Sequence, residues 1–343
     1  MKGSVLKKFL CTCLVTAAAF AATTISASAC TTIYVEGDLV QQGKPFVART
    51  EGYGSDYNKL WFISESGKWK QGDHYVGCPE YGPFEWDFTH DSYRFTYFTN
   101  DIYYDGICPE CGEKADHYSY TEFGTNEKGV SVSATETLYG NEKVTEADPY
   151  RDAEWAEANK SERIGIEETD IPTIILAEAS SAREGVKLLL DIYENYGCVA
   201  ASGVFVCDKD EVWYVENCSG TQYVAIKLNN NMIFLEPNMA VIGRVDLDDE
   251  NVIASKDLIA VAKKAGTFVG DEEKNIIDFR ASYARISETM DQRMIDGLNY
   301  LNAAYKYDSD ALVADNTKFT ISNLDASDKH VALYTNIKAD RKL

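Results

Sequence analysis

A cysteine directly follows a sequence typical of a signal-peptidase cleavage site. Ala27-Ser28-Ala29 places small residues at both positions of an A-x-A pattern, and Cys30 comes next. Cleavage after Ala29 would give Cys30 a free α-amine in addition to its thiol. An α-amine titrates at about pH 7.7–8.0 and a free thiol at about 8.5. The amine can therefore accept the proton of the thiol near neutrality, so this junction predicts a nucleophile and its base on one residue.

The residues before the junction resemble an export signal. Lys2, Lys7 and Lys8 precede an apolar run over residues 9–22 that is too short to span a bilayer comfortably. We therefore expect residues 1–29 to be removed and the protein to be secreted or held at the cell surface. Cys30 also fits the lipid-modified anchor of a non-catalytic lipoprotein, or an arbitrary first residue. Lipoprotein signals, however, prefer a Leu-like residue where this chain has Ala27.

Charge and composition limit the range of partners. The net charge is −22, and loss of the three lysines of the leader would make it −25. Such an acidic chain is a poor ligand for nucleic acid or anionic lipid. Hydrophobic residues make up 45% of the sequence, as in a globular protein, and no apolar stretch after Cys30 is long enough to span a membrane. We expect one domain over residues 30–343, and a homo-oligomer remains compatible with the sequence.

Seven cysteines remain after the leader, and an odd number favours one free thiol, for which Cys30 is the natural candidate. The other six can form disulfides or be buried thiols. Cys78, Cys108 and Cys111, with His74, can alternatively hold a structural zinc. They lie in a Cys- and Tyr-rich excursion at about residues 68–120. The four histidines show no spacing typical of a catalytic metal or a Cys–His pair, so we expect no catalytic metal.

Two short strands are predicted to position the nucleophile. Thr31–Val35 is β-branched and aromatic, and Pro45–Arg49 returns beside it after a glycine-bounded turn. Such a hairpin brings Arg49 back to Cys30.

The rest of the chain predicts an α+β fold of two antiparallel sheets covered by helices. A capping box at Ser181 begins a helix that Gly197 ends. Four strands over residues 203–207, 212–216, 223–228 and 232–235 are expected to form a meander, and Val252–Lys264 to form a helix.

Several motifs together resemble one family. The motifs are Cys30-Thr31-Thr32-Ile33, Ala48-Arg49-Thr50-Glu51, Asn126-Glu127-Lys128-Gly129-Val130 and Ala134-Thr135-Glu136-Thr137. In this order they resemble the secreted dipeptidases among the N-terminal-nucleophile cysteine hydrolases, which are related to bile salt hydrolase and penicillin V acylase. The resemblance implies an αββα sandwich that cleaves the amide bonds of small peptides without metal or organic cofactor.

The resemblance also implies roles for individual residues. Cys30 would be the nucleophile with its own amine as base, and Arg49 would lower the thiol pKa and orient the substrate. Asn238 would lie near the amine of the nucleophile. A surface ion pair for Arg49 and a plain turn for Asn238 are the structural alternatives.

Two further residues are candidates for substrate binding. Glu136 stands where the related acylases carry an oxyanion-hole asparagine, and a glutamate there would instead bind the ammonium group of a dipeptide. Arg285, or Arg280 nearby, would hold the substrate carboxylate. A solvated carboxylate and a helix-surface arginine are the structural alternatives.

One position departs from the family pattern. Gly52 occupies the place of an acid that contacts the new amine. Glu51 or Asp56 could take this role through a shifted turn, and if neither does, the site would be weak or inactive. The sequence thus predicts an exported cysteine dipeptidase, with a related acylase or a lipoprotein as alternatives.

Overall fold

The structure is a computed structural model that describes residues 30–37, 40–52, 59–77, 84–100, 121–136, 138–228, 233–285, 293, 296–297, 300 and 330–332. Its largest unit is an eight-stranded antiparallel sheet. In spatial order the strands are β14 (Val252–Ala254), β11 (Tyr223–Leu228), β10 (Val212–Asn217), β9 (Ser202–Cys207), β8 (Ser131–Glu136), β7 (Phe123–Asn126), β6 (Phe95–Asn100) and β3 (Lys59–Ser64).

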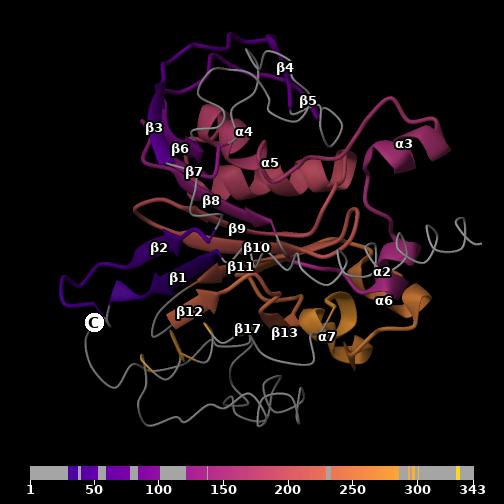
Figure 1. Cartoon of the computed structure of the whole chain (residues 1–343). Coiled ribbons are helices and arrows are strands. Elements are labelled where there is room, and N and C mark those ends of the chain that lie inside the picture. Colours follow the sequence, from indigo (N-terminus) through magenta and orange to yellow (C-terminus); the bar gives the residue numbers. More distant parts are fainter. Residues whose placement is uncertain are drawn as a thin grey trace, which may run out of the picture.

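Two helices cover one face of this sheet, α4 (Ile171–Glu178) and α5 (Ala182–Asn195) (Figure 1). α5 begins as predicted, because Ser181 Oγ accepts a hydrogen bond from the backbone N–H of Glu184 at 3.2 Å. Its apolar stripe packs onto the sheet, whereas α4 is buried all round.

A three-stranded antiparallel sheet lies on the other face of the large sheet (Figure 1). It consists of β12 (Ile233–Glu236), β1 (Thr31–Val35) and β2 (Phe46–Thr50), with β1 in the middle. Tyr214 of β10 packs against Phe234 of β12 with 4.6 Å between ring centroids. β9 and β10 are therefore buried on both faces, which explains their nearly continuous apolar sequences.

The predicted meander is right for three strands and wrong for the fourth. β9, β10 and β11 pair in sequence, but β12 leaves this sheet and pairs with β1. The neighbour of β11 is instead β14. The predicted helix over Val252–Lys264 is correspondingly wrong at its start, because α6 (Leu258–Ala265) begins after β14 ends. β-Branched Val252 and Ile253 suit the vacant edge of β11 better than a first helical turn.

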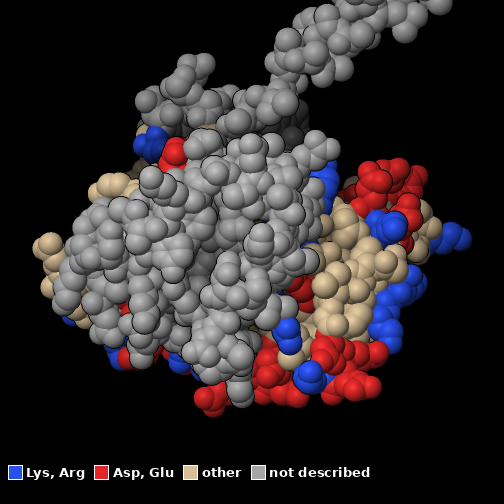
Figure 2. All heavy atoms as spheres, turned by 90° about the horizontal axis from the view of Figure 1, so that it is seen from below, with Lys and Arg blue, Asp and Glu red and all other residues tan. Residues whose placement is uncertain are grey.

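Smaller elements complete the described structure. They are the hairpin β4 (His74–Val76) and β5 (Glu85–Asp87), the sheet of β15 (Gly270–Asp271), β16 (Ile276–Asp278), β13 (Ile242–Asp246) and β17 (His330–Ala332), helices α2 (Glu142–Ala147), α3 (Ala153–Asn159) and α7 (Phe279–Tyr283), and the 3₁₀-helix η3 (Glu272–Lys274). None of the described helices is both long and apolar enough to cross a membrane. Acidic groups gather beside scattered lysines and arginines on the coloured part of the face in Figure 2.

The outer face of the three-stranded sheet also carries helical residues. A Cβ atom at Gly297 would lie 2.6 Å from a methyl group of Leu235, so the backbone there packs closely on β12. Leu235 points away from the large sheet, because its neighbour Phe234 points toward it. The α+β sandwich of antiparallel sheets and covering helices that the sequence predicts is thus confirmed.

The turn at Asn126 fastens α4 to the large sheet. Asn126 Oδ1 accepts hydrogen bonds from the backbone N–H groups of Lys128 and Val130, both at 3.0 Å. Its Nδ2 donates to the carbonyl oxygens of Leu176 and Ala179 at the end of α4. Gly129 takes a positive φ of 83° in this turn. The buried asparagine thereby fixes the start of β8, the strand that approaches Arg49.

Candidate active site

Cys30 lies at the start of β1, in the space between the two sheets. It is 8% exposed. Thr31 pairs with Thr50 and Thr32 with Arg49, which places Glu51 opposite Cys30. Alternate residues of a strand share a face, so the side chains of Cys30, Arg49 and Glu51 all point toward the large sheet. The predicted hairpin and the predicted neighbourhood of Cys30 and Arg49 are both present.

Arg49 connects the thiol to the large sheet. Its Nη2 lies 3.5 Å from Cys30 Sγ. Its Nη1 donates to the carbonyl oxygen of Glu122 at 3.1 Å, to Ser133 Oγ at 3.3 Å and to the carbonyl oxygen of Ala134. Nε is buried and has no hydrogen-bond partner among the described residues. The Nε–Nη2 edge therefore carries an unused donor beside the sulfur, suited to an oxygen atom of a substrate.

The electrostatic surroundings keep Arg49 charged. Burial alone would lower the pKa of its guanidinium, but the negative charges of Cys30, Glu168, Glu122 and Glu51 outweigh burial and raise it. Arg49 therefore supplies a fixed positive charge beside the sulfur atom of Cys30.

The carboxylate expected near Gly52 is engaged with a lysine. Glu51 Oε2 and Glu122 Oε1 both contact Lys59 Nζ. Asp56, the other candidate for the acid, lies outside the described residues. Glu51 is thus on the correct face of the site, with a cation as its described partner.

A second arginine fixes the backbone of the nucleophile. Arg293 Nη1 donates to the carbonyl oxygen of Cys30, to Thr31 Oγ1 at 3.1 Å and to Asn238 Oδ1 at 3.2 Å, while Nη2 donates to the carbonyl oxygen of Pro237 at 2.9 Å. Asn238 follows β12, and the pairing of Thr32 with Glu236 sets it opposite Cys30. Arg293 thus links the predicted Asn238 to Cys30.

Replacement of Arg293 by alanine should lower kcat roughly tenfold with little change in KM. A hydrogen bond to a charged group contributes about 1.5–3 kcal/mol, and this variant removes the donors that hold the Cys30 carbonyl. Steady-state kinetics on a variant whose melting temperature shows a folded protein would measure the effect. Asn238→Ala, which removes one acceptor only, is the matched control and should lose less. Wild-type kcat in folded Arg293→Ala would contradict the assigned role.

The two predicted substrate-binding residues lie at the end of β8 and just after α7. Glu136 ends β8, where its backbone pairs with Ser202, and the position of its side chain lies outside the described part of the structure. The guanidinium of Arg285 is exposed and stacks on Tyr139, 4.3 Å from the ring centroid. Arg280 is 8% exposed, within α7. The roles of Glu136 and Arg285 in substrate binding therefore stay predictions.

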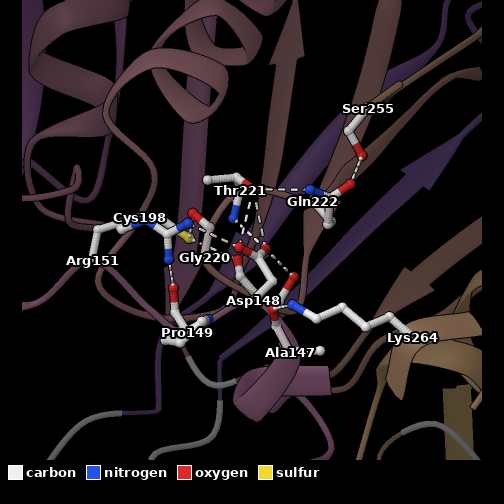
Figure 3. A network of polar contacts seen from close by, with 11 residues as sticks. Ala147, Asp148, Pro149, Arg151, Cys198, Gly220, Thr221, Gln222, Ser255 and Lys264 are labelled. Carbon is white, nitrogen blue, oxygen red and sulfur yellow. Dashed lines mark hydrogen bonds and ion pairs between the residues drawn. The ribbon is translucent and has the colours of Figure 1, made fainter. Parts of the chain in front are cut away.

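The other described cysteines are free thiols in unreactive surroundings. Burial, reinforced by Asp148, raises the pKa of Cys198, and its sulfur donates to the carbonyl oxygen of Ser219 at 3.1 Å. Figure 3 shows this thiol within a saturated polar network, in which Asp148 accepts from the N–H of Thr221 at 2.7 Å. Burial also raises the pKa of Cys207, to about 11, and that of Cys218. These thiols are structural.

The structure does not describe Cys78, Cys108 and Cys111. Zinc binding and disulfide formation by these cysteines therefore stay predictions. Within the part of the chain that the structure describes, no three His, Cys, Asp or Glu side chains gather in a way that could hold a metal ion.

Three residues of the site were missed from the sequence. Lys59, Glu122 and Arg293 occur in no recognisable motif, and each reaches the site from a distant element. The sequence around Glu122 carries no signal that this residue contacts Arg49.

Comparison with known proteins gives a consistent result. The model for Peptidase family C69 matches residues 29–322. A "Probable dipeptidase B" of Streptococcus pyogenes is 34% identical over 247 residues, covering 70% of this chain and 43% of that protein. A "Probable dipeptidase" of Salmonella dublin is 31% identical over 262 residues, covering 75% of this chain and 53% of that protein. The chain spans about half the length of these relatives.

Among solved structures, penicillin V acylase from Agrobacterium tumefaciens is similar at a TM-score of 0.32 and 12% identity, covering 61% of this chain and 49% of that one. The fold described above rests on the sheets and helices of this chain itself.

Proposed function

Because the chain belongs to peptidase family C69, we propose that it is an exported cysteine dipeptidase in which Cys30 becomes the N-terminal residue and attacks the peptide bond of a dipeptide. The 3.5 Å contact between Cys30 Sγ and Arg49 Nη2 is the observation that carries the proposal. It unites the one cysteine at a predicted cleavage junction with a half-buried cation whose Nε–H has no acceptor among the described residues.

The reaction follows from these groups. The α-amine of Cys30 takes the proton of the thiol, and the sulfur forms a bond to the carbonyl carbon of the substrate. The Nε–Nη2 edge of Arg49 donates to the oxyanion of the tetrahedral intermediate. The resulting ammonium group returns its proton to the departing amine as the C–N bond breaks, which leaves a thioester. Water, deprotonated by the same amine, releases the acid and restores the thiol.

Maturation after Ala29 is part of this proposal. The leader with Lys2, Lys7 and Lys8, the apolar run and the A-x-A pattern support it. A lipid-modified Cys30 has a thioether sulfur and an acylated amine, neither of which can perform its step. Mass spectrometry of the N-terminus of the native protein therefore decides between the enzyme and the lipoprotein alternative.

Dipeptides should be cleaved at least roughly a hundredfold faster, in kcat/KM, than the same dipeptides N-acetylated, because Glu136 would lose its ammonium partner and a charge in a binding site that has lost its partner is costly. A panel of free and blocked dipeptides tests this, with Glu136→Gln as the matched variant. Glu136→Gln should lose activity on free dipeptides, which should bring its kcat/KM values for free and N-acetylated dipeptides closer together. Equal rates on free and blocked substrates would favour the acylase alternative.

A further inference from the structure

A row of aromatic side chains on the large sheet borders the candidate active site. Trp61 of β3 is paired with Phe98 of β6, and Phe98 with Phe123 of β7. Phe123 is in turn paired with Ser133 of β8. Residues directly opposite each other on neighbouring antiparallel strands lie on the same face of a sheet. The four side chains therefore form one row across four strands, with Ser133 at its inner end.

Two contacts show which face of the sheet carries this row. Ser133 Oγ accepts a hydrogen bond from Nη1 of Arg49 at 3.3 Å. Gly124, the neighbour of Phe123, points to the other face, because a Cβ atom there would lie 2.7 Å from a methyl group of Leu176 in α4. α4 and α5 cover that other face (Figure 1). The aromatic side chains therefore lie on the same side of the large sheet as the nucleophile.

The inner end of the row is close to the nucleophile. Nη1 of Arg49 also donates to the carbonyl oxygen of Glu122 at 3.1 Å, and this carbonyl group is in the peptide bond that joins Glu122 to Phe123. Nη2 of the same guanidinium lies 3.5 Å from Cys30 Sγ. One planar group thus connects the sulfur atom to the start of the row. A large side chain of a bound dipeptide can cover this span.

The row is apolar and becomes more exposed with distance from the nucleophile. Ser133 is buried, Phe123 is 36% exposed and Trp61 is 55% exposed. Phe98 and Phe123 stack with 4.4 Å between ring centroids. An aromatic side chain buries about 150–250 Å², so three partly exposed rings fall short of the roughly 800 Å² per partner of a stable protein interface. Their exposed surface is thus of a size for one apolar side chain.

We propose that the row of Trp61, Phe98 and Phe123 is a substrate subsite, which holds a large apolar side chain and gives the protein a preference for dipeptides with an aromatic or bulky aliphatic residue. This preference rests on the proposed dipeptidase function. An apolar side chain packed on Phe123 would remove both apolar surfaces from water and gain ring contacts. Because the row begins beside Arg49, a side chain held there keeps the carbonyl group of the substrate within reach of Cys30.

Substrate preference tests the row in the processed protein. Two dipeptide series carry alanine, leucine or phenylalanine, either first or second, with glycine at the other position. In one series kcat/KM should be at least about tenfold higher for phenylalanine than for alanine, since even one methylene in an apolar pocket is worth about tenfold or more. In Phe123→Ser this ratio should fall to about threefold or less, whereas Phe123→Leu, which keeps an apolar surface, should retain most of it.

Phe46→Ser is the matched control. Phe46 is 40% exposed, but it points to the opposite side of the small sheet from Arg49, because an odd number of residues separates them along β2. This variant should keep the wild-type ratio. Equal kcat/KM for alanine and phenylalanine dipeptides in the wild type, or an unchanged ratio in folded Phe123→Ser, would overturn the subsite. A wild-type dimer that Phe123→Ser converts to a monomer without a change in the ratio would make the row an interface between two copies.

Photo-crosslinking to Cys30→Ala needs neither hydrolysis nor a variant of the row. A dipeptide of benzoylphenylalanine and glycine should label peptides that contain β6 or β7, as located by mass spectrometry. An excess of a phenylalanine dipeptide should prevent the labelling. Labelling of other peptides only would overturn the subsite. A wild-type protein that cleaves no dipeptide, while the label still maps to β6 or β7, would refute only the proposed function.

Discussion

A protein with extra residues ahead of Cys30 should hydrolyse dipeptides at least about 10²–10⁴-fold more slowly than the same protein with Cys30 at its N-terminus, the usual range for general base catalysis. The extra residue turns the α-amine into a planar amide, which cannot accept the proton of the thiol. A fusion with a specific protease site directly before Cys30 allows both forms to be measured in one preparation. Activity should appear as the processed N-terminus appears in the mass spectrum.

The controls separate the amine from the thiol and from other bases. Cys30→Ala should be inactive before and after processing, with an unchanged melting temperature. Single replacements of the histidines should leave kcat near the wild-type value; these are His74, His90, His117 and His330. Full activity of the unprocessed fusion, or one essential histidine, would show that another group is the base.

Replacing Arg49 by glutamine should lower kcat/KM by about a thousandfold. Loss of one oxyanion donor costs about 10²–10³-fold, and the variant also removes the positive charge 3.5 Å from the sulfur atom. Arg49→Lys retains the charge but not the planar edge, so it should recover only part of the rate. When Cys30 is alkylated with iodoacetamide at pH 7, it should react more slowly in Arg49→Gln than in Arg49→Lys.

Arg285→Ala is the matched control, since it removes an arginine that stacks on the exposed Tyr139. If Arg285 binds the substrate carboxylate, KM should rise for dipeptides and stay unchanged for their C-terminal amides. An Arg49→Gln enzyme no slower than Arg285→Ala would show that the contact with Cys30 has no catalytic value.

Local features of the site could be predicted from the sequence because short-range signals encode them. Thr31–Val35 is a strand as predicted, and the return strand places Arg49 beside Cys30 because a hairpin of that length has one register that fits. The helix after Ser181 was likewise predictable from its cap and its apolar stripe. In each case the partners lie within about 20 residues of one another.

Features that depend on packing between sheets could not be predicted. β12 pairs with the open edge of β1. Nothing in the sequence of Ile233–Glu236 favours that edge over the open edge of β11. Glu122 and Lys59, 63 residues apart in the chain, meet because β3 and β7 pair with opposite edges of β6. A buried glutamate that shares a lysine has the same sequence signature as a solvated one.

The contact between Arg293 and the carbonyl oxygen of Cys30 spans 263 residues. Contacts between residues far apart in the chain generally form slowly, because the loop between them must be closed. The backbone at Cys30 therefore gains this anchor only after residue 293 has been synthesised and has packed against it. A chain shortened before residue 293 can still form β1 and β2, but the backbone at Cys30 has no such anchor. The protein would thus become catalytically competent only once its folding is complete, and partial chains would have little peptidase activity.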